Sequence, residues 1–120
     1  MDSKRLLFLL RQPPYGTSHA IEALESVLVA GVFDQRVSVL FRDDGVWQLL
    51  DGQDGAPVDR RTIAKVAQAL PQYDVNALYV CAASLQQRNL TEKDLSVPVT
   101  VLDEHAQRAL LADQDAVVSD

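Results

Sequence analysis

Short apolar runs alternate with segments of helical periodicity along the whole chain. Five runs have the length and composition of single strands: residues 5–10, 37–41, 78–80, 97–102 and 116–119. Between them lie four stretches that we expect to be helical: residues 19–32, 59–70, 82–88 and 103–111. This alternation predicts an α/β fold with a mainly parallel, roughly five-stranded sheet.

The first apolar run indicates how the layers are arranged. Arg5–Leu10 is apolar almost throughout, which is typical of a central strand with helices on both of its faces. Right-handed crossovers between parallel strands then predict a three-layer sandwich with a flavodoxin-like strand order. Residues 1–120 contain no internal repeat, linker or low-complexity segment, so we expect a single domain.

Turn and capping residues divide these elements. Residues 12–18 contain two prolines and a glycine, and this loop either walls a site at the carboxyl edge of the first strand or forms a rigid turn. Pro98 indicates an edge strand or the start of a strand. Asn89 is suited to ending the helix before it, and Thr91 with Asp94 has the spacing of a capped turn.

Apolar side chains also mark buried positions outside the strands. In the last helix, three residues are expected to point inward: Ala106, Ala109 and Leu110. Residues 46–50 form an apolar patch that contains the only tryptophan of the chain. Trp47 fits a core position and a subunit interface equally well, because tryptophan is enriched at interfaces as well as being strongly buried.

Cys81 is the only cysteine, and the pattern around it places it at a junction between two elements. Leu78–Val80 predicts a buried strand, and the two alanines after Cys81 are strong helix formers. Ser84 and Gln87 have the spacing of a capping box. We therefore expect Cys81 at the carboxyl end of a strand and at the amino end of a helix.

This junction favours a reactive thiol. Ligands of open α/β sheets bind at the carboxyl edge of the strands, and the free N–H groups at a helix start stabilise an anion. A thiolate is an anion, so we expect the pKa of Cys81 to be lowered and its reactivity to be raised. The alternative is a small buried hydrophobe, which is the usual role of a lone cysteine after an apolar strand.

Composition and charge exclude several functional classes. A single cysteine excludes an intrachain disulfide and a cysteine-rich zinc site, and it indicates a reducing compartment. No apolar run approaches the ~20 residues of a membrane span, and the run Leu6–Leu10 after Lys4-Arg5 is too short for a signal peptide, so we expect a cytoplasmic protein without membrane contacts. The net charge of −6 argues against direct binding of nucleic acid.

Familiar catalytic and cofactor motifs are absent from the sequence. It has no metal-ligand spacing such as His-Glu-x-x-His, no glycine-rich phosphate loop and no Gly-x-Ser-x-Gly elbow, so we expect neither a metal nor another cofactor. The acidic pairs Asp43-Asp44 and Asp103-Glu104 fit solvated loops better than an acid–base pair. Cys81 is therefore the one candidate for a covalent role.

Several segments resemble the DsrE/DsrF-like family. The most specific are Asp44–Leu50 (Asp-Gly-Val-Trp-Gln-Leu-Leu) and Tyr79–Leu85 (Tyr-Val-Cys-Ala-Ala-Ser-Leu), and Pro14–Thr17 and Ala23-Leu24 agree as well. The resemblance extends from the first strand to the last with similar spacing. Within the family, the chain is most similar to the TusC-like (DsrF-like) subunits.

The resemblance implies a place in a sulfur relay. TusC-like chains assemble with TusB-like and TusD-like chains into a heterohexamer of two heterotrimers. The complex passes persulfide sulfur from a TusA-like donor toward a TusE-like acceptor, and the sulfur becomes the 2-thio group of the wobble uridine in certain tRNAs. Related DsrEFH complexes serve sulfur oxidation, which is the alternative function.

The resemblance also suggests roles for individual residues. In the family, the best-supported sulfur-carrying cysteine belongs to the TusD-like subunit, so this chain is expected to be mainly an assembly subunit. Cys81 stands at the matching place after the corresponding strand and is expected to be an accessory sulfur carrier. The candidates for subunit interfaces are Pro14, Tyr15, Gly16 and Trp47. A flavin- or nucleotide-binding module is a further alternative, although the chain lacks a Ser/Thr-rich phosphate loop.

Overall fold

A five-stranded parallel sheet forms the centre of the computed structural model, which describes residues 4–13, 19–32, 36–50, 69–70, 75, 77–95 and 97–119. The strands are β1 (Arg5–Leu10), β2 (Arg36–Phe41), β3 (Ala77–Cys81), β4 (Thr100–Leu102) and β5 (Ala116–Ser119). Their order is β4-β3-β2-β1-β5, and every neighbouring pair is parallel. The predicted α/β fold with a parallel sheet is confirmed.

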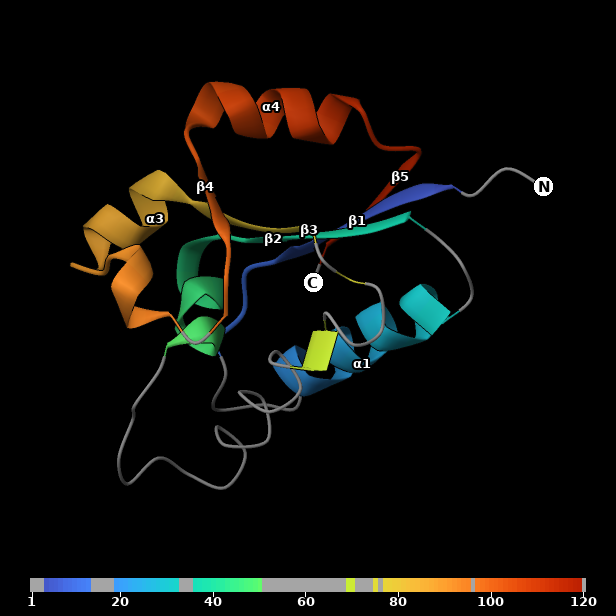
Figure 1. Cartoon of the computed structure of the whole chain (residues 1–120), viewed down its shortest axis with the longest axis horizontal. Helices are drawn as coiled ribbons and strands as arrows, with labels where there is room; N and C mark the ends of the chain where they lie inside the picture. The colour runs from blue at the N-terminus through green and yellow to red at the C-terminus, as the bar shows by residue number, and fades with distance from the viewer. Residues whose placement is uncertain are drawn as a thin grey trace.

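Helices lie on both faces of this sheet (Figure 1). α1 (His19–Val32) covers one face and α4 (Glu104–Ala112) covers the opposite face, which confirms the three layers. α3 (Ala82–Gln87) and the 3-10 helix η1 (Asp43–Leu49) lie at the carboxyl edge of the strands, and a second 3-10 helix, η3 (Glu92–Asp94), follows α3. The helix predicted at 59–70 lies outside the described residues except for its last two positions.

The order of the strands differs from the flavodoxin order, in which the chain reverses direction after its second strand. Here β1 to β4 are added in one direction, and the chain reverses only after β4 to place β5 beside β1. Because parallel crossovers are right-handed, a connection that runs back along the sheet must cross the other face. This explains why α4, which joins β4 to β5, lies opposite α1.

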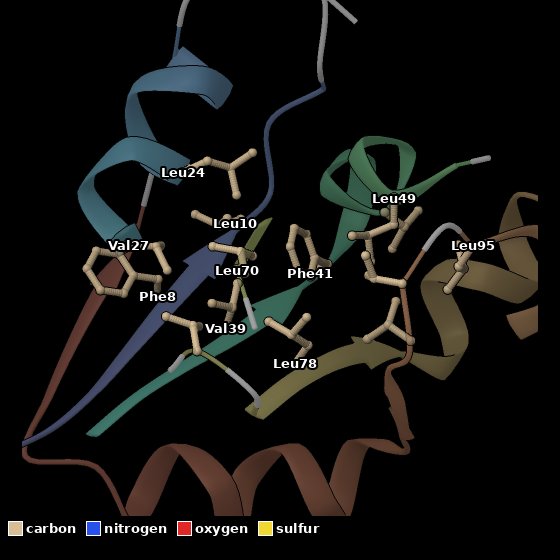
Figure 2. Packing of buried hydrophobic residues seen from close by; sticks show 14 of the residues in the cluster. Phe8, Leu10, Leu24, Val27, Val39, Phe41, Leu49, Leu70, Leu78 and Leu95 are labelled. Atoms are coloured by element: carbon tan, nitrogen blue, oxygen red, sulfur yellow. The ribbon is translucent and has the colours of Figure 1, made fainter. Parts of the chain in front are cut away.

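The main hydrophobic core lies between the sheet and α1. Alternate residues of β1, β2 and β3 point to this face and share one apolar cluster with Leu24 and Val27 of α1. Figure 2 labels the other members that pack there: Phe8, Leu10, Val39, Phe41, Leu49, Leu70, Leu78 and Leu95. Leu70 and Val75 belong to this cluster as well, so both lie on the α1 face of the sheet.

The opposite face of the sheet is covered less completely. Leu7 and Leu40 point to it and are fully buried, whereas Leu9 and Tyr79 point to it and are only half-buried. These side chains are the ones that alternate with the members of the main core along each strand. The sheet therefore has one thick apolar layer on the α1 face and a thinner one on the α4 face.

The residue that α4 buries is a glutamine. Gln107 is the one buried residue of α4, whereas Ala106 and Leu110 are half-buried. Ala109 is exposed, so the prediction that it points inward is wrong. The reason is that Gln107 occupies the position on the helix that faces the sheet, and the inward stripe is displaced by part of a turn.

The 3-10 helix η1 follows β2 directly and packs tightly against the end of β1. Asp43 opens it with a left-handed φ of 52°, and the N–H of Arg42 donates to Leu10 O at 3.0 Å. A Cβ on Gly45 would lie 2.0 Å from Leu10 O, so only glycine permits this approach. The apolar patch predicted around Trp47 is thereby fixed at the carboxyl edge of the sheet.

Proline, cap and turn residues act largely where the sequence predicts them. β4 is an edge strand, as Pro98 indicates, but it begins at Thr100 because proline has no N–H for the strand ladder. Asn89 takes a left-handed φ of 55° after α3. Thr91 and Asp94 form a capping box, in which the Thr91 N–H donates to Asp94 Oδ2 at 2.8 Å.

Candidate functional site

Cys81 lies where β3 ends and α3 begins, as the sequence predicts. It is the last residue of the strand and the N-cap of the helix, with an extended backbone (φ −75°, ψ 122°). In the sheet it is in register with Leu102, the last residue of β4. Its side chain is 6% exposed, so the sulfur sits just beneath the surface at the carboxyl edge.

The alternation of β3 determines which layer the sulfur belongs to. Leu78 and Val80 point into the main core on the α1 face, so Tyr79 and Cys81 point to the α4 face. The sulfur is therefore placed in the thinner of the two layers, beside the start of α4. A polar neighbour can reach it there without crossing the main core.

Hydrogen bonds make the Cys81 thiol more acidic than an ordinary one. Burial raises its pKa, but donors from three residues lower it: the hydroxyl and N–H of Ser84, the side-chain amide of Gln107 and the N–H of Ala83. The net pKa lies below the ordinary value of a cysteine thiol. The predicted direction is confirmed, and the cause is direct hydrogen bonding to the charged sulfur.

Ser84 interacts with the sulfur of Cys81 and does not cap a helix. The predicted capping box of Ser84 with Gln87 is wrong, because α3 begins earlier, at Ala82, with Cys81 as its N-cap. The buried hydroxyl of Ser84 accepts a hydrogen bond from the N–H of Asp43 at 2.9 Å. Its own proton is therefore left to donate to Cys81, and η1 holds the oxygen in place.

Arg88 fastens α3 to η1 on the outer side of this site. Its Nη2 lies 2.9 Å from Asp44 Oδ1, and its Nη1 donates to Ser84 O at 3.1 Å. The Arg88 side chain is mostly buried, whereas Asp44 is exposed. The Arg88 guanidinium thus links η1, which contains Asp44, to α3, which contains Ser84.

Gln107 is the residue of the site that the sequence did not single out. Its Nε2 donates to Leu102 O at 3.0 Å, and hydrogen bonding from its side chain is one of the causes that lower the pKa of Cys81. Asp103 sets the start of α4, since its Oδ1 accepts the N–H of Ala106 at 2.8 Å. The available signal was a glutamine among apolar positions on the inward face of a helix that starts at a strong N-cap residue.

The predicted interface residues do not form a described cluster. Pro14, Tyr15 and Gly16 lie outside the described residues. Trp47 is half-buried on η1, so it has not become a core residue. Its neighbour Gln48 is buried, and the Gln48 Nε2 donates to Gln12 O at 2.8 Å, which ties η1 to the start of the loop after β1.

The acidic pairs are solvated, as predicted. All four side chains are exposed: Asp43, Asp44, Asp103 and Glu104. Asp44 is paired with Arg88, and Asp103 caps α4, so both have structural roles. Among the described residues, no group of three or more His, Cys, Asp or Glu side chains is placed to hold a metal ion.

The helices of the described part of the chain are all too short or too polar to cross a membrane. The chemical capability of the site lies in one acidic thiol and the neutral donors around it. Such a thiol can act as a nucleophile toward a sulfur atom of a disulfide or a persulfide.

Comparison with known proteins assigns the chain to a family. A sequence model described as the DsrE/DsrF-like family matches residues 4–119. The chain belongs to the DsrE/DsrF-like family. The resemblance seen in Asp44–Leu50 and Tyr79–Leu85 is thereby confirmed, and these DsrE/DsrF-like segments are the ones that build η1, β3 and the start of α3.

Relatives of this DsrE/DsrF-like chain include proteins of two names. A TusC homolog from Pseudomonas aeruginosa is 43% identical over 117 residues, which cover 98% of each chain. The intracellular sulfur oxidation protein DsrF of Allochromatium vinosum is 46% identical over 92 residues, or 77% of this chain and 68% of that protein. A TusC homolog from Vibrio vulnificus is 38% identical over 99 residues, with coverages of 82% and 84%.

A solved structure shares the DsrE/DsrF-like chain's architecture. The crystal structure of the YchN protein from E. coli superposes with a TM-score of 0.79 over 98% of this chain and 99% of YchN. The two sequences are 15% identical, so the likeness concerns the fold alone. It supports the layered sheet described above.

Proposed function

We propose that this chain is a subunit of a TusBCD-like sulfur-relay complex that delivers persulfide sulfur toward 2-thiolation of the tRNA wobble uridine. It acts mainly in assembly with TusB-like and TusD-like chains, as a single cytoplasmic domain. Cys81 serves as an accessory sulfur carrier between a TusA-like donor and a TusE-like acceptor. The TusC homolog that matches the chain over nearly its full length supports this proposal.

The observation that carries the sulfur-carrier role is the place of Cys81 at the junction of β3 and α3, where neighbouring groups lower the pKa of its thiol. Donors from Ala83, Ser84 and Gln107 favour the thiolate, which is the nucleophilic form of cysteine. The thiolate attacks the terminal sulfur of a donor persulfide, so that a new S–S bond forms at Sγ and the S–S bond of the donor breaks. The donor cysteine leaves as a thiolate, and sulfur moves without net oxidation or reduction.

Mass spectrometry after incubation with a persulfide donor tests this role. The complex is reduced, freed of reductant and mixed with a persulfidated donor protein. We expect Cys81 to gain the mass of one sulfur atom, and the Cys81→Ser variant to gain none at this position. A donor that loses its sulfur while Cys81 stays unmodified would contradict the carrier role.

A purely structural role is the second candidate, and the burial of the sulfur favours it. With Cys81 only 6% exposed, a donor protein reaches Sγ only after the site opens. In this case the half-buried Trp47 packs against a sister chain, together with Pro14, Tyr15 and Gly16. Cys81→Ser then leaves the 2-thiouridine content of tRNA unchanged.

The assembly role has its own test at Trp47. The variant Trp47→Asp, co-expressed with its partner chains, is expected to elute from a size-exclusion column as a smaller species, because a charge at the interface is costly to desolvate. The matched control is Val29→Asp, at an exposed apolar position on α1. A complex of unchanged size with Trp47→Asp would remove Trp47 from the interface.

The relative named for intracellular sulfur oxidation favours a further alternative, in which this chain belongs to a DsrEFH-like complex. Deleting the gene for this chain distinguishes the two pathways. Loss of 2-thiouridine from tRNA supports the TusBCD-like assignment. Unchanged tRNA with impaired oxidation of stored sulfur supports the DsrEFH-like assignment.

A further inference from the structure

Gln107 occupies a position where an apolar side chain is the ordinary choice. It is 5% exposed and faces the sheet from α4, while the apolar residues Ala106 and Leu110 beside it are only half-buried. Glutamine is mostly a surface residue, and burying its amide costs free energy unless hydrogen bonds replace those to water. The bonds that Gln107 makes are therefore the reason for its place.

The amide of Gln107 is anchored to the strand next to Cys81. Its Nε2 donates to Leu102 O at 3.0 Å, and Leu102 is the register partner of Cys81. The backbone of Gln107 is fixed as well, since its N–H donates to Asp103 O at 3.0 Å in the first turn of α4. Both ends of the side chain are thus held relative to the end of β4.

This anchoring determines the direction of the second N–H. An amide nitrogen carries two hydrogens in one plane, and Leu102 O takes one of them. Cys81 points to the α4 face from the neighbouring strand, at the same level as Leu102. The remaining hydrogen of Gln107 is thus available to Cys81, and hydrogen bonding from the Gln107 side chain lowers the pKa of the thiol.

We propose that Gln107 is a positioning residue for Cys81, whose anchored amide aims one N–H at Sγ and so stabilises and orients the thiolate that receives sulfur. This inference rests on the proposed function for its role in sulfur transfer. An amide does not titrate near neutral pH, so the donor is present at every pH at which the thiolate forms. A histidine or lysine in this place would change its protonation state with pH, and so would not offer the same donor throughout.

The test is the pH dependence of Cys81 alkylation in the intact complex. Iodoacetamide reacts with the thiolate, so the midpoint of its rate profile reports the acidity of Cys81. Gln107→Met removes the donor at similar length, and Gln107→Glu replaces it with a negative charge. We expect the midpoint to rise in the order wild type, Gln107→Met, Gln107→Glu. The rate near pH 7 should fall about three- to tenfold in Gln107→Met, as for the loss of one hydrogen bond.

A matched control lies just beyond the other end of α4. The Gln114 Nε2 donates to Leu110 O at 3.1 Å, so Gln114→Met removes the same kind of amide-to-carbonyl bond away from the sulfur. We expect its alkylation profile to match the wild type. The rate at high pH, where every variant is a thiolate, should agree within about twofold, because access to Sγ is unchanged.

The outcomes separate this inference from the proposed function. Unchanged midpoints in both Gln107 variants would overturn the positioning role even if Cys81 still gains sulfur. Raised midpoints without sulfur loading of the wild type would keep the positioning role and reject the carrier role. If Gln107→Met does not fold, Gln107→Glu carries the test, because its side chain has the shape of glutamine.

Discussion

At the scale of single residues, the sulfur of Cys81 is subject to two opposing effects. Its burial would by itself make an inert thiol with a raised pKa, as in most buried cysteines. The hydrogen bonds from Ser84, Gln107 and Ala83 outweigh this effect and lower the pKa. Several polar groups therefore surround this one sulfur atom. A cysteine that only fills space in a core does not need such neighbours.

The lowered pKa predicts how stability changes with pH. A thiol that is more acidic in the folded than in the unfolded chain adds stability above the unfolded pKa, about 8.5, and loses it as the pH falls through the folded pKa. We expect the free energy of unfolding of the wild type, relative to Cys81→Ala, to increase as the pH rises from below the folded pKa to above the unfolded pKa. Urea denaturation at several pH values measures it. A difference that is constant over this range would contradict a stabilised thiolate.

At the scale of elements, the sequence predicts best what has a local cause. Strand β1, helix α1 and the Thr91 capping box all arise from patterns within a few residues, and each lies where the sequence predicts it. The partners of Cys81 are different, because Gln107 meets it only through the pairing of β3 with β4. Local spacing predicts a helix cap at Ser84, and this prediction is wrong because the group that its hydroxyl meets, the N–H of Asp43, is distant in the sequence.

The N-cap of α4 links stability to the site. Asp103→Ala removes the acceptor of the Ala106 N–H and is expected to cost about 1 kcal/mol of stability. Because α4 carries Gln107, it should also lower the alkylation rate of Cys81 near neutral pH. Thr91→Ala removes a comparable cap from η3 and is the matched control: a similar loss of stability is expected, with unchanged thiol reactivity. Equal reactivity in the two variants would show that the start of α4 does not govern the thiol.

At the scale of the whole molecule, the two layers around the sheet have different tasks. The α1 face holds the large apolar cluster shown in Figure 2, which supplies the main hydrophobic stabilisation. The α4 face holds the thiol, a buried glutamine and several half-buried apolar residues. Stability and chemistry are thus placed on opposite sides of one sheet, so a change on one side has a limited effect on the other.

Two substitutions on α1 test this division. Leu24 is fully buried in the main core, so Leu24→Ala is expected to cost about 2–5 kcal/mol of stability through lost burial and a cavity. Val29 on the same helix is 56% exposed, and Val29→Ala should change stability by less than about 0.5 kcal/mol. Thermal or urea denaturation measures both. Similar losses in the two variants would contradict the core described here.

The position of β1 between β2 and β5 affects how the chain folds during its synthesis. The N–H of Arg5 donates to Asp115 Oδ2 at 2.7 Å, and the N–H of Asp115 donates to Arg5 O at 2.8 Å, so two ends of the described chain meet. While a ribosome is still making residues 115–119, the leucine-rich β1 has an open backbone edge that can pair with another nascent chain. The sheet is therefore complete only after residues 115–119 have left the ribosome, and until then a chaperone that shields this edge would protect the nascent chain from aggregation.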